Sequence, residues 1–142
     1  MTGVVRRTIR RPDLYLLDTN ACLDFTLARS EVLKERIRQN YRKGLAISAV
    51  TLAELRVGAR HPEAEPEDEE RVERFVGTIK IHDFDGAAAE AYGNLARQIG
   101  VKRTSFDRLI AAHALSLGLV VVTRNKRDFA DVPGLMVENW TE

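Results

Sequence analysis

Four acidic residues in this sequence lie beside apolar runs, where a carboxylate risks being buried away from water. They are Asp18, Glu54, Asp107 and Asp128. Burying a carboxylate costs several kcal/mol unless a cation or a hydrogen-bond donor receives it. Acids that share one cleft also repel one another, and a divalent cation removes that conflict. The sequence has one cysteine, Cys22, and the candidate ligands are carboxylate oxygens, so the expected metal ion is Mg²⁺ or Mn²⁺ and zinc is disfavoured.

Each acid taken alone also has a purely structural interpretation. Asp18 could cap the helix that follows it, and Glu54 could pair with a neighbouring arginine. Asp107 could be an acid favoured by a helix dipole, which is worth about 0.3 to 1 kcal/mol. Asp128 could belong to an ordinary polar loop. The functional interpretation therefore depends on whether the fold brings the four acids together.

The surrounding sequence predicts an α/β fold. Apolar runs predict strands at 14–17, 45–48, 79–84, 119–123 and 135–140, and helices at 21–28, 31–41, 48–59, 86–99 and 105–117, with one more ending near 76. This alternation is typical of a three-layer sandwich, with a mostly parallel central sheet of 4–5 strands flanked by helices. Parallel strands end at one edge, so Asp18, Asn125 and Asp128 should meet there. The helix of Glu54 starts at that edge, while the position of Asp107 is left open.

Length and composition bound the class of protein. A chain of 142 residues, 44% apolar and 30% charged, fits one globular domain, assigned to 14–142, after a basic arm at 1–13. The net charge of +1 argues against a uniformly basic protein that coats nucleic acid. No apolar run approaches the roughly 20 residues that cross a bilayer, and no secretion signal precedes the first strand. A cytoplasmic location without membrane attachment is therefore expected.

Several segments, taken in order, resemble the PIN domain and specifically the VapC toxins of bacterial toxin–antitoxin pairs. LLDTN resembles the family's first-strand acid motif, and ISAVTLAELRVGA resembles its glutamate helix. FDRLIAAHALSLGLVVVTRNKRDF is similar to its third acid and fourth strand, and VPGLMVENW to its terminal strand. The resemblance covers nearly the whole chain after the arm. It implies that Asp18, Glu54 and Asp107 are catalytic acids that bind Mg²⁺ or Mn²⁺.

The fourth acid position departs from a common family pattern. Many PIN domains place an aspartate directly after the threonine of the fourth strand, whereas Arg124 and Asn125 follow Thr123 here. Asp128 is therefore assigned as the fourth catalytic and metal-binding acid, and Asn125 as an amide that orients metal or water. Whether Asn125 or Asp128 fills the position, and whether one ion or two bind, stays open. The residues expected to orient the carboxylates are Thr19, Asn20, Thr123 and Asn125.

The resemblance implies a metal-dependent endoribonuclease toxin that hydrolyses RNA phosphodiester bonds, with tRNA as the expected substrate. Arg124, Lys126 and Arg127 lie beside the acids and could hold phosphates. The family also implies a homodimer and a cognate VapB-type antitoxin that covers the site. A hetero-oligomer is expected in the antitoxin complex, which would bind promoter DNA through the antitoxin.

Other functional classes fit the residues less well. A non-catalytic PIN-like module that binds RNA or protein is the main alternative, favoured by the missing aspartate after Thr123. A phosphatase with a strand-end aspartate would need a second acid where Asn20 stands, and a signalling receiver would need an acidic pair just before Asp18. An NAD or nucleotide-triphosphate enzyme would need a glycine-rich loop between strand and helix, and none is found.

Overall fold

The computed structural model describes residues 13–142, so the basic arm predicted at 1–13 lies outside the described residues except for Asp13. One sheet has the strand order β3-β2-β1-β4-β5, and its neighbouring strands pair in parallel. The strands are β1 (Tyr15–Leu17), β2 (Leu45–Ser48), β3 (Lys80–His82), β4 (Val120–Val122) and β5 (Val137–Glu138). The predicted α/β sandwich is confirmed, and the described sheet is wholly parallel.

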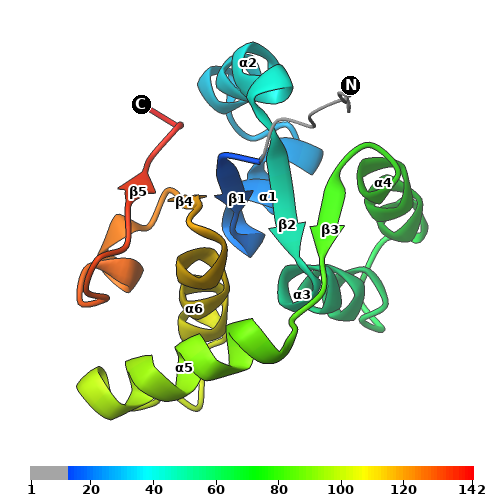
Figure 1. Ribbon diagram of the computed structural model, residues 1–142. Coiled ribbons are helices and arrows are strands. Elements are labelled where there is room, and N and C mark those ends of the chain that lie inside the picture. The colour runs from blue at the N-terminus through cyan, green and yellow to red at the C-terminus, as the bar shows by residue number, and fades with distance from the viewer. Residues whose placement is uncertain (1–12) are drawn as a thin grey trace, which may run out of the picture.

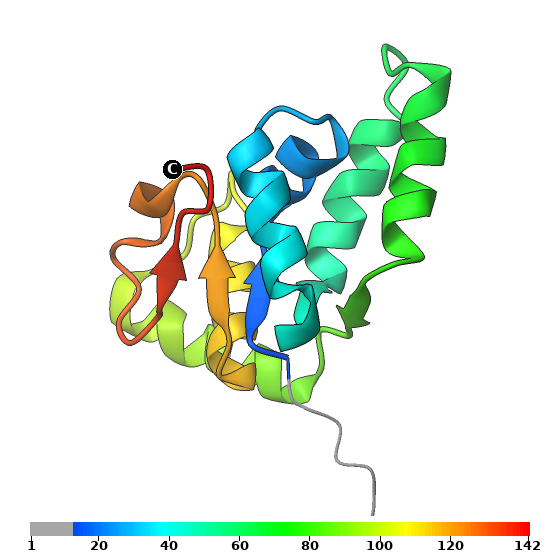
Figure 2. The ribbon, with the colours of Figure 1, turned by 90° about the horizontal axis from the view of Figure 1, so that it is seen from above.

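Helices cover both faces of this sheet (Figures 1 and 2). They are α1 (Thr19–Thr26), α2 (Glu31–Asn40), α3 (Ala49–Ala59), α4 (Pro66–Val76), α5 (Gly86–Ile99) and α6 (Asp107–Leu117), with short 3-10 turns η1 (Tyr41–Lys43) and η2 (Lys126–Phe129). Helices α1 to α4 pack on one face, and α5 and α6 pack on the other. Among the described residues, no helix is both long and apolar enough to span a bilayer.

The central strands are apolar on both sides because each side supports its own core. Leu17 and Val122 are buried in the core under α1 to α4, whereas Leu16 and Val121 are buried in the core under α5 and α6. Successive side chains on a strand point to opposite faces, so a strand covered on both sides reads as a continuous apolar run. Polar residues first appear where the central strands end, since Asp18 follows β1 and Thr123 follows β4.

Capping groups set the helix starts, and two starts differ from the prediction. Helix α1 begins two residues earlier than predicted because Asp18 itself is the N-cap and accepts a hydrogen bond from the backbone N–H of Ala21 at 2.7 Å. Helix α6 begins at Asp107 with Phe106 as its N-cap, whereas the predicted range of 105–117 had Ser105 as the cap. There the Ser105 hydroxyl accepts a bond from the N–H of Asp107 at 3.1 Å, in the turn before the helix.

The C-terminal segment packs back on the sheet. Trp140 is 1% exposed, and its ring meets that of Tyr15 edge-on with centroids 4.8 Å apart. The Arg36 guanidinium lies 5.5 Å from the centre of the same ring, and the indole N–H donates to Glu138 at 2.8 Å. The last residues are therefore part of the core that supports β1 and α2.

We expect Trp140→Ala to lower the free energy of unfolding by about 3 to 5 kcal/mol, because it removes a large buried ring and leaves a cavity. Met136, which is 66% exposed, gives the control, and Met136→Ala should change stability by no more than about 0.5 kcal/mol. Urea denaturation of the two variants measures both values. If Trp140→Ala were as stable as Met136→Ala, the C-terminal segment would not be part of the core.

Candidate active site

Asp18 lies where β1 ends, beside the end of β4. Its residue is 2% exposed, and its carboxylate bonds to the side chain of Thr123 as well as to the Ala21 N–H. Thr123 is itself buried, and its oxygen accepts a bond from the N–H of Asn125 at 3.0 Å. Because β1 and β4 pair in parallel, the two strand ends share one edge of the sheet. Asp18 is thus held rigidly from two elements.

Glu54 reaches the same edge from α3. It is half-buried, and it accepts a hydrogen bond from the Thr19 hydroxyl at 2.5 Å. The structural alternative, pairing with a neighbouring arginine, is not what the structure shows. Arg56 and Arg60 instead form ion pairs with glutamates of α4. Val57, one turn after Glu54, is 71% exposed, so this face of α3 borders solvent rather than the core.

Asp107, whose position the sequence left open, joins the same site from the start of α6. Its carboxylate raises the pKa of Asp18 and of Glu54, which requires it to lie within electrostatic range of both. Asp128, exposed in η2, in turn raises the pKa of Asp107. The four predicted acids therefore form one electrostatic group, called here the acidic cluster: Asp18, Glu54, Asp107 and Asp128.

Burial is the main cause of the pKa shifts in the acidic cluster. It raises the pKa of Asp18 to about 6, against the opposing hydrogen bonds from Thr123 and Ala21. Burial likewise raises the pKa of Glu54, which the Thr19 bond opposes, and of Asp107, which Ser105 and Lys102 oppose. Carboxyl groups held in this way are poised to exchange protons for a cation.

The donor set suits a hard divalent cation. It consists of carboxylate oxygens, which Mg²⁺ and Mn²⁺ prefer. Within residues 13–142, no three acidic, histidine or cysteine side chains stand close enough to enclose an ion as they lie. Protein-bound Mg²⁺ commonly keeps several waters and takes only one or two carboxylates, so a preformed cage is not required.

The remaining predicted site residues lie around the acidic cluster with different degrees of support. Thr19 and Thr123 bond directly to its acids. Asn20 and Asn125 are half-buried, and the backbone of Asn125 donates to the Thr123 hydroxyl and accepts a bond from the N–H of Asp128 at 3.0 Å. The three predicted phosphate-binding residues are exposed on the loop after β4 and on η2: Arg124, Lys126 and Arg127.

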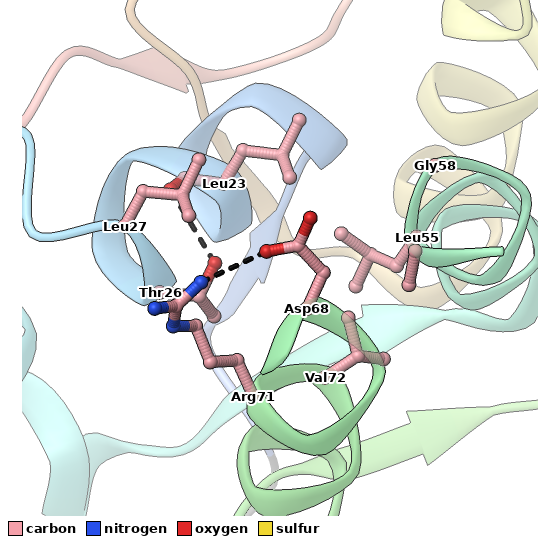
Figure 3. Close-up of a pocket in the computed structure, with 9 residues that line it drawn as sticks. Leu23, Thr26, Leu27, Leu55, Gly58, Asp68, Arg71 and Val72 are labelled. Atoms are coloured by element: carbon pink, nitrogen blue, oxygen red, sulfur yellow. Dashed lines mark hydrogen bonds and ion pairs between the residues drawn. The ribbon is translucent and has the colours of Figure 1, made fainter. Parts of the chain in front are cut away.

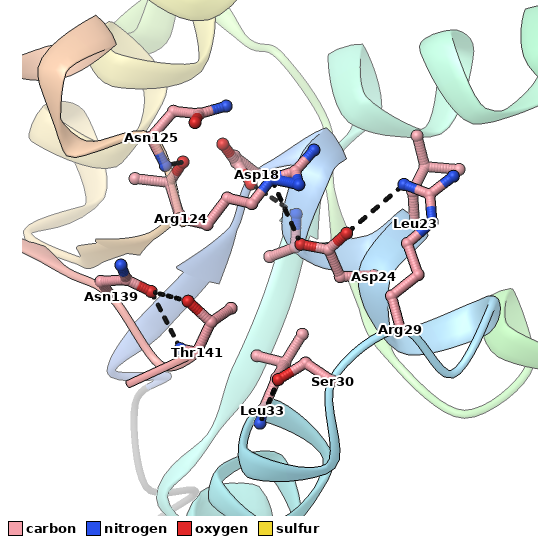
Figure 4. Close-up of polar contacts among 12 residues, drawn as sticks. Asp18, Leu23, Asp24, Arg29, Ser30, Leu33, Arg124, Asn125, Asn139 and Thr141 are labelled. Atoms are coloured by element: carbon pink, nitrogen blue, oxygen red, sulfur yellow. Dashed lines mark hydrogen bonds and ion pairs between the residues drawn. The ribbon is translucent and has the colours of Figure 1, made fainter.

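Sequence reasoning missed one acid in this region. Asp24 of α1 is 2% exposed, and its carboxylate pairs with Arg29 at 3.4 Å and with Arg124 at 3.5 Å (Figure 4). It also contributes to the raised pKa of Asp18. An acid between Leu23 and Phe25 was a signal of the kind used for Glu54, and it would have found Asp24.

A separate groove lies between α1, α3 and α4. Figure 3 shows Leu23 of α1 and Leu27, the residue after α1, beside it, facing Leu55 of α3 and Val72 of α4. Its polar end holds the Arg71 guanidinium, which donates to Asp68 at 2.8 Å. The groove contains no member of the acidic cluster and is therefore not part of the candidate active site.

The family is established by comparison with known proteins. Residues 15–135 match the family model described as the PIN domain, which covers most of the chain. The chain therefore belongs to the PIN-domain family, as its parallel sheet and acidic strand-end site had indicated.

Within that family the chain is of the VapC type. It is 40% identical over 131 residues to the "tRNA(fMet)-specific endonuclease VapC" of Shigella flexneri, covering 89% of this chain and 98% of that protein. The protein of that name from Salmonella typhimurium is 36% identical over 129 residues, covering 89% and 97%. The fold matches a crystal structure of VapBC2 from Rickettsia felis bound to a DNA fragment from its promoter, with a TM-score of 0.80 and 28% identity over 89% of this chain and 98% of that one.

We expect Asp18→Asn to stabilise the metal-free protein at neutral pH. Asparagine keeps the N-cap acceptor and removes a buried charge. Because folding raises the pKa of Asp18 to about 6, above the ordinary value of about 4, the folded protein binds this proton more tightly than the unfolded chain does. The stability that protonation contributes is complete below about pH 4 and is lost as the pH rises through 6.

The variant should therefore exceed the wild type by roughly 2 to 3 kcal/mol at pH 7.5 in EDTA, and the difference should shrink towards pH 4. Urea denaturation across this range gives the measurement. Asp85→Asn is the matched control, because exposed Asp85 caps α5 in the same way, through the Ala88 N–H at 3.0 Å. If the free energies of unfolding of the wild type and Asp18→Asn differ by the same amount at every pH, the pKa of Asp18 is not raised in the folded protein.

Proposed function

We propose that this chain is a metal-dependent endoribonuclease toxin of a toxin–antitoxin pair, which hydrolyses phosphodiester bonds in RNA, with tRNA as substrate. The observation that carries the proposal is the acidic cluster at the carboxyl edge of the parallel sheet, where hydroxyl groups of Thr19 and Thr123 fix two of its acids. The printed names of the Shigella and Salmonella relatives, which are tRNA-specific endonucleases, support the same reaction and substrate.

In this proposal the chain's own residues hold and orient the reactants. Asp18 and Asp107 hold the principal Mg²⁺ or Mn²⁺, and Asp128 completes a second position with Asn125 beside it. Glu54, held by the Thr19 hydroxyl, orients the attacking water. A bound divalent ion would supply Lewis acidity, which makes water a stronger nucleophile at neutral pH and stabilises charge on phosphate oxygens. Arg124, Lys126 and Arg127 bind neighbouring phosphates.

The proposed partners are a VapB-type antitoxin and a second copy of this chain. The antitoxin would cover the acidic cluster, and a basic side chain entering it would take the place of the cation. In the hetero-oligomeric complex the antitoxin would bind promoter DNA. The Rickettsia VapBC2 complex, which is bound to its own promoter fragment, supports this arrangement. The proposed site of action is the cytoplasm.

Purified, antitoxin-free protein should cut total tRNA at discrete positions in Mg²⁺ or Mn²⁺, and the new 5′ ends can be mapped. EDTA should abolish the cuts because it removes the ion, and Asp107→Asn should abolish them because it removes a proposed ligand of that ion. Asp85→Asn, an acid outside the acidic cluster, is the control and should cut normally. If neither tRNA nor total cellular RNA is cut by folded protein, the non-catalytic binding module becomes the better explanation.

Millimolar Mn²⁺ should raise the melting temperature of the wild type, because a ligand that binds the folded state alone stabilises it by mass action, by about 2.7 kcal/mol at 100 times its Kd. Asp18→Asn and Asp107→Asn should lose most of the shift. Comparing Asp128→Asn with Asn125→Ala shows which residue fills the fourth metal-binding position. We expect Asp128→Asn to lose more of the Mn²⁺-induced shift in melting temperature than Asn125→Ala does. A wild-type melting curve that does not respond to either ion would argue against a metal site.

A further inference from the structure

A buried acid without a part in the proposed reaction lies next to the acidic cluster. Asp24 is 2% exposed, and the side chains on either side of it in the sequence pack against the apolar core. Its charge raises the pKa of Asp18 and thereby adds to the repulsion within the site. A buried carboxylate that repels a neighbouring acid in this way is stable only if positive groups lie close to it.

Two arginines supply that compensation: Arg29, five residues after Asp24, and Arg124, from the loop after β4. Arg29 approaches one oxygen of Asp24 through Nη1 at 3.4 Å, and Arg124 approaches the other through Nε at 3.5 Å (Figure 4). The arginine side chains are 49% and 40% exposed, whereas that of Asp24 is 3% exposed. A guanidinium has five N–H donors, so each arginine faces solvent with most of its donors unused by Asp24. The three residues together carry a net positive charge.

The backbone fixes both arginines in relation to the acidic cluster. After α1 the chain turns at Ala28, whose φ of 52° lies in the left-handed region that alanine rarely adopts. The turn returns Arg29 to the helix, where its N–H donates to the backbone oxygen of Asp24 at 2.8 Å. Arg124 follows directly after Thr123, which bonds to Asp18. The backbone thus fixes where each arginine side chain starts, and the contact with Asp24 orients its guanidinium group.

We propose that Arg29 and Arg124 form a phosphate-binding pair for the RNA strand beside the acidic cluster, and that Asp24 is the positioning residue that holds them. The inference rests on the proposed ribonuclease function. Acids gathered in one place repel a polyanion, so a substrate phosphate needs fixed positive charge close by. Guanidinium groups suit phosphate because their planar donors can bind two oxygens at once, and a buried partner removes the entropy of searching for that geometry.

The direction in which Asp24→Asn changes RNA affinity distinguishes this positioning role from a simple effect of charge. If Asp24 acted only as a negative charge near RNA, Asp24→Asn would reduce repulsion and tighten RNA binding. If Asp24 positions the two arginines, the same substitution releases them and weakens binding, although the protein has become more positive. A role confined to stability would change the melting temperature and leave RNA affinity unaltered.

The test measures binding without cleavage. The full chain carrying Asp107→Asn is titrated in EDTA against fluorescently labelled tRNA, and anisotropy is followed at several salt concentrations. Arg29→Ala and Arg124→Ala should each raise Kd about tenfold and lower the slope of log Kd against log salt by about 0.7 to 0.9, the value of one phosphate contact. Asp24→Asn should raise Kd by roughly three- to tenfold. Arg60→Ala, which removes an exposed arginine paired with Glu69 on α4, is the matched control and should change neither quantity.

Two further readouts keep the test decisive if Asp24→Asn folds poorly. In a chain lacking both arginines, Asp24→Asn should have no further effect on Kd. Arg29→Lys and Arg124→Lys, which keep the charge but lose the planar fork, should bind with intermediate affinity. With cleavage-competent protein in Mg²⁺, Arg29→Ala should raise KM more than it lowers kcat.

The outcomes separate the inference from the proposed function. RNA binding that is unchanged in the arginine variants, or tightened by Asp24→Asn, overturns the phosphate-binding pair and leaves the ribonuclease proposal standing. Failure of the Asp107→Asn protein to bind tRNA or any other RNA at low salt overturns both.

Discussion

Repulsion between carboxylates held at one edge of the sheet is the constraint on which the rest of the site depends. Asp18 cannot move away from Asp107, because it caps α1 while its own strand is locked between β2 and β4. Hydrogen bonds from Thr123 and Thr19 reduce the cost for Asp18 and Glu54 but do not remove it, since burial still raises the pKa of both acids. The fold thus maintains a concentration of negative charge that only a cation, a proton or a basic side chain can neutralise.

The parallel sheet makes this arrangement possible, and much of it could be predicted from sequence. A run such as Leu14 to Leu17 that is apolar on both faces and stops at Asp18 indicates a central strand with its acid at the carboxyl edge. Asn125 and Asp128 follow β4 for the same reason, and the pairing of β1 with β4 brings the segment that carries them to the same edge of the sheet as Asp18. Asp107 was harder to predict, because it starts a helix, and the edge at which a helix starts depends on how the preceding connection crosses the sheet.

What could not be predicted depends on contacts between distant segments. Local spacing offered Glu54 an arginine partner, yet the acidic stretch that becomes α4 takes both neighbouring arginines, and Glu54 is left to accept a bond from Thr19. The pairing of Asp24 with Arg124 could not be predicted, because Arg124 comes from the other end of the chain. Asp18 was interpreted as either a helix cap or a working acid, whereas it caps α1 and lies in the acidic cluster at once.

This double role of Asp18 has an evolutionary consequence. Codons for aspartate and asparagine differ by one base, and asparagine is an equally good N-cap, so the shortest mutational step away from an ionised Asp18 still starts α1. If the chain is a toxin, a lineage could silence it by that single transition and go on making a folded protein. Such a protein would keep the surfaces outside the acidic cluster by which it recognises its partners, so loss of toxicity and loss of assembly would be separate events in the history of the pair.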